Sequence, residues 1–227
     1  MNARYGFKAL GLFQSQEEID NYPIAPSGNL RPGDIKYEDV NGDGIISSMY
    51  DYVKIGYGDV PEITFSLDMN LSYKNFYATL LWQGVTNTDY TLSGTYDTGV
   101  LSSTNYTASF AENGNSPYYR IEGAWTPENP NAKYPRLTTV NSGNNAWHST
   151  WWLVNGEYLR LKNANIGYNV PSKVLKSTPF SSVNIYLAGT NLLTFSHFKY
   201  VDPESPSVSN GYYPQQKTYS LGLKVTF

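Results

Sequence analysis

Strict alternation of apolar and polar residues is the feature that most constrains how this chain folds. In residues 217–227 every second position is apolar and the positions between are polar. The apolar set is Tyr219, Leu221, Leu223, Val225 and Phe227. Successive side chains of a β-strand point to opposite faces, so the pattern predicts a strand with one apolar and one polar face.

Residues 63–73 repeat this alternation from Ile63 to Tyr73, and weaker strand patterns cover 5–12, 76–85, 158–170 and 183–195. The two strong segments are long enough for a tilted strand to cross a bilayer. Helical periodicity is confined to one or two turns at 15–20 and 172–176. The pattern therefore predicts an all-β chain of antiparallel strands.

The connections between these strands alternate in length. Residues 73–76 allow a tight turn and 171–182 a short excursion, whereas 13–61, 86–157 and 196–216 are long and polar. In an antiparallel barrel this order places the long loops at one rim and the short turns at the other, as in outer-membrane barrels. The chain then ends at the short-turn, periplasmic rim.

Composition excludes several kinds of binding partner and several kinds of reactive site. Only 15% of the 227 residues are charged, Tyr occurs 21 times, and the net charge of −3 leaves no basic surface for nucleic acid. The absence of Cys excludes a disulfide framework, a thiolate metal site and a Cys nucleophile. His148 and His197 lie in separate loops without metal-ligand spacing or a motif for nucleophile activation, so no enzyme is predicted.

One loop has the spacing of a calcium site. Asp39, Asn41 and Asp43 occupy the first, third and fifth positions, and Ile45 at the seventh would add its backbone carbonyl. The twelfth position is a Tyr where a bidentate carboxylate belongs, and the nearest acid is Asp51. These residues predict a weak Ca²⁺ site, and the alternative is a pair of ordinary turns.

Aromatic residues cluster in the loops at Trp147, Trp151 and Trp152, at Tyr118 and Tyr119, and at Tyr212 and Tyr213. Such rings can stack on sugars, but they also form the interfacial girdle of a membrane barrel or pack within loops. Girdle or loop packing is the favoured interpretation. The strand pattern likewise fits a soluble β-sandwich, in which Leu221 and Leu223 are buried, whereas a membrane barrel exposes them.

Six segments follow one another along the chain: YGFKALGLFQSQEEI at 5–19, GDIKYEDVNGDG at 33–44, WTPENPNAKYPRL at 125–137, YLRLKN at 158–163, GTNLLTF at 189–195 and the final strand. In this order they resemble the C-terminal part of the SusC/RagA family of TonB-linked outer-membrane transporters. The resemblance implies the C-terminal strands of a transmembrane barrel of about 22 strands with long extracellular loops, in the outer membrane of a Gram-negative bacterium.

The resemblance also implies a function. Members of this family import oligosaccharides or peptides, a SusD-like surface lipoprotein caps the barrel, and TonB acts through an N-terminal plug. Residues 1–227 match only the C-terminal portion, without the plug or the first barrel strands, so we expect a fragment that does not transport alone. The alternative is a secreted all-β module, such as a calcium-dependent carbohydrate-binding adhesin.

Overall fold

The computed structural model describes residues 3–24, 29–91, 118–137, 144–197, 202–204 and 215–227. The chain divides into two compact units. One consists of residues 1–59, 89–154 and 207–212, and we call it the loop unit. The other consists of 60–88, 155–206 and 213–227, and we call it the sheet unit.

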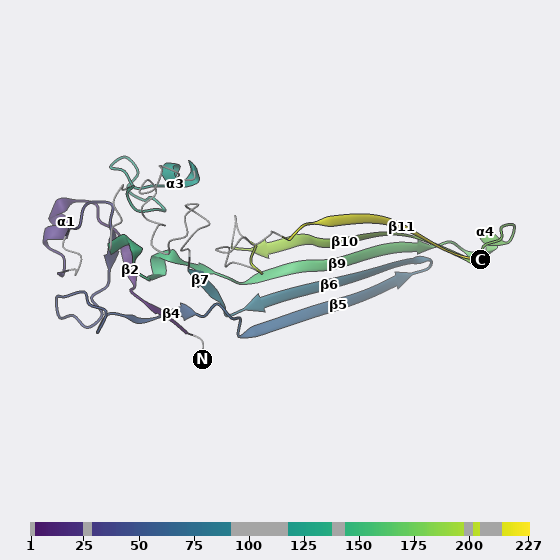
Figure 1. The fold of residues 1–227 in the computed structure, drawn as a ribbon, viewed down its shortest axis with the longest axis horizontal. Helices are drawn as coiled ribbons and strands as arrows, with labels where there is room; N and C mark the ends of the chain where they lie inside the picture. Colours follow the sequence, from purple (N-terminus) through teal and green to yellow (C-terminus); the bar gives the residue numbers. More distant parts are fainter. Residues whose placement is uncertain (1–2, 25–28, 92–117, 138–143, 198–201, 205–214) are drawn as a thin grey trace. The chain divides into compact units, whose positions relative to one another are not determined.

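The sheet unit is one antiparallel sheet of five long strands in the order β11-β10-β9-β6-β5 (Figure 1). The strands are β5 (Ile63–Tyr73), β6 (Phe76–Thr86), β9 (Tyr158–Asn169), β10 (Ser182–Ser196) and β11 (Thr218–Thr226). All of the long strands predicted from alternation are present with ends that differ by at most a residue. Each strand pairs with the next strand of this sheet along the chain, and β6 pairs with β9 although the chain passes through the loop unit between them.

Short connections of this unit gather at one end of the sheet (Figure 1). Lys74, at φ 54°, makes the tight turn between β5 and β6, and helix α4 (Ser172–Leu175) links β9 to β10. The C-terminus lies at this end too, where Ser181 N–H donates to the Thr226 carbonyl at 2.7 Å. The predicted separation of short turns from long loops is therefore present within the sheet unit.

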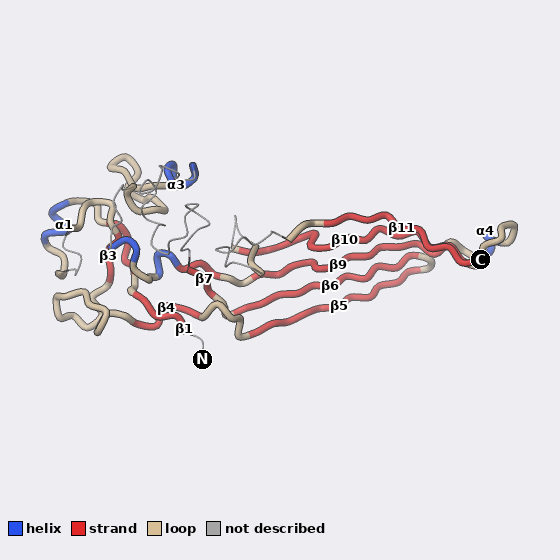
Figure 2. Tube along the Cα trace, viewed as in Figure 1, coloured by secondary structure: helices blue, strands red, loops and turns tan. Residues whose placement is uncertain are grey.

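The loop unit is built from short elements (Figure 2). Antiparallel pairs join β1 (Ala3–Gly6) with β4 (Val53–Tyr57), β2 (Ala9–Leu12) with β3 (Ile35–Tyr37), and β7 (Asp89–Thr91) with β8 (Leu153–Asn155). The helical turns are α1 (Gln16–Asp20), α3 (Tyr118–Glu122), η1 (Asn144–Ala146) and η2 (Thr150–Trp152). The strand expected at 5–12 is thus two strands, interrupted at Phe7, whose N–H donates to the His148 carbonyl instead.

A hydrophobic core holds these short elements together, although the sequence pattern predicted only loops for most of them. Its buried members are Phe7, Leu12, Ile35, Tyr37, Ile46, Ala132, Tyr134 and Trp152. Trp147 stacks on Phe7 with ring centroids 4.8 Å apart. Burial of large aromatic and aliphatic side chains stabilises the unit without long strands.

None of the helices in the described part of the chain is long and apolar enough to cross a membrane.

Candidate functional site

The sheet has one continuous apolar face, assembled row by row across its strands. Leu71 pairs with Ala78, Ala78 with Ile166, and Ile166 with Leu187. Leu187 pairs in turn with Leu221 on β11. Exposed large residues of this face are Ile63, Phe65, Leu67, Tyr73, Phe76, Ile185, Leu193, Phe195, Tyr219 and Leu223. The in-register pairing converts alternation within single strands into one apolar surface.

Exposure of this face distinguishes the two predicted architectures. The side chains of Leu221 and Leu223 are 76% and 65% exposed. In a sandwich they would lie in the core between two sheets. A soluble monomer rarely exposes so large a contiguous apolar patch, so the face is suited to contact lipid. The membrane-barrel interpretation, rather than the sandwich, fits this sheet.

The strand lengths agree with a bilayer. Strands β5 and β6 each have 11 residues, or about 36 Å at about 3.3 Å per residue. Tilted by about 40°, such a strand rises about 28 Å, close to the apolar band of about 25 Å in outer-membrane barrels. Aromatic rings lie at the short-turn end of the face, where Phe76 and Tyr168 contact each other with centroids 4.7 Å apart.

The opposite face is polar. One row across the five strands consists of Asn70, Thr79, Asn165, Ala188 and Ser220. Because this face shares the same strands as the apolar face, it would line the interior of a closed wall. Its uncharged amides and hydroxyls can hydrogen-bond to water or to a polar solute.

A buried ionic cluster lies on this polar face, and Arg160 on β9 is its centre. The Arg160 guanidinium contacts Asp202 Oδ1 at 2.8 Å and Glu204 Oε1 at 3.1 Å. Its other N–H groups donate to Thr194 Oγ1 at 2.9 Å and Gln215 Oε1 at 3.0 Å. The side chains of Arg160 and Asp202 are only 4% and 8% exposed. Burial makes the pairing obligatory, because either charge alone would be strongly destabilising.

Lys162 extends this cluster, which we call the Arg160 cluster and define as Arg160, Lys162, Asp202, Glu204 and Gln215. Lys162 Nζ contacts both Glu204 oxygens, at 2.9 and 2.7 Å. Gln215 Nε2 donates to Glu204 Oε2 at 2.7 Å. The cluster fastens residues that follow β10 and precede β11 to the polar face of β9, so it supports the sheet rather than offering a vacant binding site.

The predicted calcium loop is present as a series of turns. The Asp39 carboxylate accepts N–H bonds from Gly42 and Gly44, both at 2.8 Å. Asp43 Oδ1 accepts from Ile45 N–H at 2.8 Å, and Asn41 Nδ2 donates to Asp43 Oδ2 at 2.8 Å. Gly42 and Gly44 have φ of 73° and 82°, which explains the glycines at these positions.

Asp51 lies at the base of this loop. It is fully buried, and its two oxygens accept the N–H groups of Val40 at 2.8 Å and Ser47 at 2.7 Å. These bonds close the loop at its base. Among the described residues, no three Asp, Glu, His or Cys side chains are grouped so that they could hold a metal ion. A cation would therefore depend on Asp39, Asn41, Asp43 and carbonyls such as that of Ile45, and Ca²⁺ stays a prediction.

The aromatic clusters of the loop unit serve packing. Trp152 is buried and donates its indole N–H to the Asn145 carbonyl at 2.7 Å, while Trp147 and Trp151 pack against the core. Loop packing, rather than a girdle, is thus the role of these residues. Tyr118 is exposed, and Tyr212 and Tyr213 lie outside the described residues.

Sequence reasoning missed the buried polar network beside this core. Asp34 is fully buried and pairs with Arg136 Nε at 2.8 Å, and Asn145 Nδ2 donates to its Oδ1 at 2.7 Å. Asn145 Oδ1 accepts the Ile35 N–H at 2.8 Å, so it connects β3 to η1. The GDIKY segment at 33–37 was recognisable in the sequence. Asn145, which binds both Asp34 and Ile35, lies more than a hundred positions away.

Two tyrosines of the loop unit are held neutral by burial. Burial raises the pKa of Tyr22 to about 12 and raises the pKa of Tyr37 further. Tyr37 O–H donates to the Asn144 carbonyl at 2.7 Å, and Tyr37 N–H donates to Tyr22 Oη at 2.7 Å. The phenols therefore act as structural hydrogen-bonding groups.

No protein-family model matches the chain. TonB-dependent receptor P26 of Formosa agariphila is 33% identical over 98% of this chain, and TonB-dependent receptor P3 of the same organism is 29% identical over 98%. The chain spans 22% of the length of each relative.

Solved structures show the same fold. The structure of the RagAB peptide transporter matches all of this chain and 23% of its own, with a TM-score of 0.68 and 20% sequence identity. The RagAB peptide importer in an open-open state matches with a TM-score of 0.65 and 19% identity. The match supports the all-β assignment.

Proposed function

Because the chain belongs to the TonB-dependent receptors of the SusC/RagA type, we propose that its sheet forms part of the barrel wall of an outer-membrane nutrient importer. The observation that carries this proposal is the two-faced sheet. Leu221 and Leu223 are exposed on one face, which lipid would cover, while Ser220 and its row line the polar face. The relatives are named as TonB-dependent receptors and as a peptide transporter, so the proposed role is transport.

The strands at the two edges of the sheet support a place within a larger wall. In the described part of the chain, β5 and β11 each pair with one neighbouring strand, so one side of each offers backbone donors and acceptors. Such groups must be satisfied in a membrane, which requires a closed barrel. We propose that residues 1–227 supply the C-terminal portion of that barrel and that further strands, the plug and TonB complete the importer.

A surface lipoprotein of the SusD type is the proposed partner. A matching solved structure is named the RagAB peptide transporter. In this chain the loop unit exposes Ile24, Ile45, Met49 and Tyr50, and Ile24 and Ile45 are joined by a β-bridge. Met49→Asp in the intact transporter should reduce co-purification with a SusD-like lipoprotein, whereas Leu10→Asp, another exposed position, serves as the matched control.

The proposed cargo is an oligosaccharide or a peptide. The uncharged amides and hydroxyls of the polar face, such as Asn70 and Thr79, suit either class because both present hydrogen-bonding groups. Growth of a transporter-deletion strain on single glycans and on peptide mixtures would decide between them. Complementation by the intact transporter gene on only one of these nutrients would identify the cargo class.

Cysteine labelling tests the placement of the two faces, because the native chain contains no Cys to replace. Leu221→Cys and Leu223→Cys in the transporter in its own membrane should react with a lipid-soluble maleimide. Ser220→Cys and Lys224→Cys should react with a charged, water-soluble maleimide instead. Equal reaction of all four positions with the charged reagent would contradict the proposal, as would recovery of the protein outside the membrane fraction.

A further inference from the structure

The short-turn end of the sheet unit carries lysines and no acidic side chains. It comprises residues 70–79, 165–188 and 220–227 (Figure 1). These segments contain Lys74, Lys173, Lys176 and Lys224 but no Asp or Glu, although the whole chain has a net charge of −3. Positive charge is therefore concentrated at this end of the sheet.

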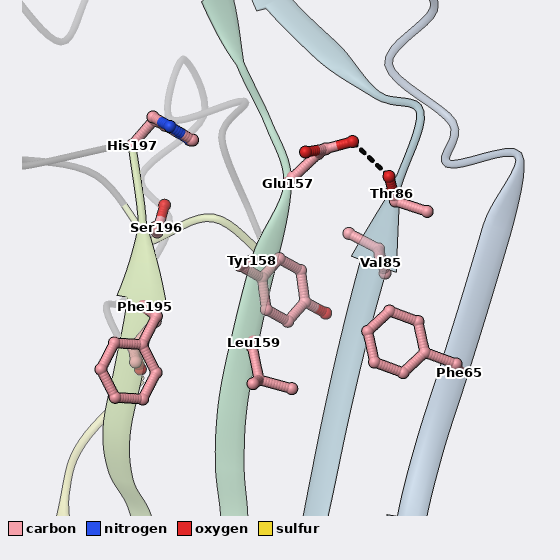
Figure 3. Close-up of a pocket in the computed structure, with 10 residues that line it drawn as sticks. Phe65, Val85, Thr86, Glu157, Tyr158, Leu159, Phe195, Ser196 and His197 are labelled. Atoms are coloured by element: carbon pink, nitrogen blue, oxygen red, sulfur yellow. Dashed lines mark hydrogen bonds between the residues drawn. The ribbon is translucent and has the colours of Figure 1, made fainter.

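The acidic side chains of the sheet unit all lie outside these segments. They are Glu62, Asp68, Glu157, Asp202 and Glu204. Three of them have partners at the opposite end of the strands. Glu157 accepts a hydrogen bond from Thr86 (Figure 3), and Asp202 and Glu204 contact Arg160. Side-chain carboxylates therefore do not balance the lysines at the short turns.

The lysines of the two short turns have no acidic partner. Elsewhere in the chain, Lys8, Lys36 and Lys162 each contact a Glu carboxylate. Lys74, Lys173 and Lys176 are exposed, and none of the three forms an ion pair with another described residue. Their ammonium groups can donate to an external anion.

Lys74 lies at the border of the apolar face. Its ammonium group is 5.2 Å from the centroid of the Tyr73 ring. Tyr73 pairs with Phe76, and Phe76 with Tyr168, in the last row of this face on β5, β6 and β9. Tyr73 and Phe76 are both exposed. The ammonium group thus lies beside exposed rings, as a Lys does where it extends from hydrocarbon to the headgroups of a bilayer.

The turn itself does not call for Lys at this position. Lys74 has a φ of 54°, in the left-handed region that two-residue turns usually fill with Gly or Asn. A side chain in an unfavourable backbone conformation is often retained for function rather than for folding. The ammonium group, rather than the turn, accounts for the residue found here.

Helix α4 brings lysines and apolar side chains together in the same way. Lys173 and Lys176 are exposed, and so is Val174 between them. The connection after α4 reaches the apolar side of the sheet, where Phe180 contacts Phe227 with ring centroids 5.4 Å apart. Phe227 follows Leu223 and Val225 in the alternation of β11 and is exposed.

We propose that this end of the sheet binds the phosphate groups of anionic phospholipids through Lys74, Lys173 and Lys176, which we call the rim lysines. Tyr73 and Phe76 would then contact the acyl chains. The inference rests on the proposed function, because it requires the apolar face to meet lipid. It agrees with the orientation in which the short turns lie at the periplasmic rim. Opposite charge favours an anionic headgroup over a zwitterionic one.

Lipid retention measured by native mass spectrometry tests this assignment. The intact transporter, purified in detergent, is mixed with phosphatidylglycerol or phosphatidylcholine of identical acyl chains. We expect phosphatidylglycerol to be retained about tenfold better at low ionic strength, since each lysine near an anionic headgroup contributes about fivefold. Glycerophosphoglycerol, which has the same headgroup without acyl chains, should not displace it.

Lys74→Asn separates a lipid contact from a structural role. Asn is favoured in the left-handed turn, so the variant should fold with unchanged or higher stability. It should nevertheless lower the preference for phosphatidylglycerol by about fivefold, because one ammonium group is lost. Replacement of all three rim lysines by Gln should remove the preference.

The matched control replaces three other exposed lysines, Lys54, Lys133 and Lys217, by Gln. It changes the net charge of the chain by the same amount but leaves the short-turn end intact. The preference for phosphatidylglycerol should therefore be the same as in the unmodified transporter.

The outcomes separate this inference from the proposed function. Equal retention of the two lipids, or an unchanged preference without the rim lysines, overturns the headgroup assignment and leaves the membrane placement standing. An equal loss in the control variant would attribute the preference to net charge and overturn it too. Displacement by glycerophosphoglycerol would indicate a site for soluble phosphate esters instead. Recovery of the transporter from a soluble fraction overturns both the inference and the proposed function.

Discussion

The guanidinium of Arg160 donates to the carboxylate of Asp202 at 2.8 Å, and both side chains are almost completely buried against the polar face of the sheet. Arg160 belongs to β9, whereas Asp202 follows β10 by a few residues. The ion pair therefore joins a strand to the connection that leads on to β11. Its consequences for stability can be measured directly.

Arg160→Met should destabilise the folded transporter by about 3 to 5 kcal/mol, because Asp202 and Glu204 would be left buried without their main cationic partner. The free energy of unfolding, measured by urea titration in detergent micelles, tests this. Lys224→Met removes the same charge from an exposed position on the same polar face and should change stability by less than about 0.5 kcal/mol. Equal effects of both variants would contradict a special role for Arg160.

Leu221→Arg should cost about 2 to 4 kcal/mol in a bilayer, because Leu221 lies near the middle of β11 on the apolar face. Ser220→Arg places the same charge on the polar face, one residue away, and should cost about 1 kcal/mol or less. Folding into lipid vesicles, followed by resistance to heat in electrophoresis gels, gives the comparison. If Ser220→Arg were the more damaging change, the assignment of the Leu221 face to lipid and of the Ser220 face to the barrel interior would be wrong.

Acidification should weaken the junction between β6 and β9 through Glu157. Hydrogen bonds from Thr86 and Asn87 lower the pKa of this carboxyl below its ordinary value of 4.5. A lowered pKa in the folded state contributes stability that is present above pH 4.5 and is lost as the pH falls through the folded-state value. Urea midpoints at about pH 7 and about pH 3.5 should therefore differ less in Glu157→Gln than in the native protein. An identical pH dependence in both proteins would contradict this role.

The loop from Asp39 to Ile45 is expected to bind Ca²⁺ weakly, with a Kd of about 0.1 to 1 mM or weaker, because no carboxylate occupies its twelfth position. Isothermal titration calorimetry with CaCl₂ on the intact transporter should show heat that disappears in Asp43→Asn. Asp59→Asn changes an acid outside the loop and serves as the control. Absence of binding at about 10 mM Ca²⁺ would leave Asp39 and Asp43 with a turn-forming role only.

The long strands could be predicted because their signal is local. Ile63–Tyr73 and the segment ending at Thr226 alternate at every position, and the observed strands have nearly the predicted ends. Alternation follows from strand geometry alone and needs no information from distant residues. The tight turn at Lys74 was predictable for the same reason, since only two residues separate the strands.

The loop unit could not be predicted in this way. Residues 13–61 and 86–157 have little periodicity, yet Ile35, Tyr37 and Trp152 form one buried core. Asn145 joins this core through a bond to the Ile35 N–H, which lies 110 positions earlier in the chain. Contacts of this range leave no repeating pattern, so the segment resembles a set of polar loops when only the sequence is read.

The candidate sites could not be predicted from the sequence for the same reason. Asp51 was placed among possible metal ligands by its position after the acidic loop, whereas its buried carboxylate closes the loop by accepting two backbone N–H groups. Arg160 lies in the YLRLKN segment at 158–163, but that segment does not indicate its partners, and Glu157 lies in no motif. Their roles depend on partners such as Asp202, 42 positions from Arg160, and Thr86, 71 positions from Glu157.

The sequence by itself determined that this protein has long strands with one apolar and one polar face, because a period of two residues leaves a β-strand little choice of which side chains share a face. Tertiary structure alone decided that the faces align across five strands, that the apolar face is exposed, and that buried charges fasten a connection to β9. The physical reason is the separation along the chain of the residues that interact. Alternation acts between neighbouring residues, whereas pairing register, burial and ion pairs arise only when distant segments meet.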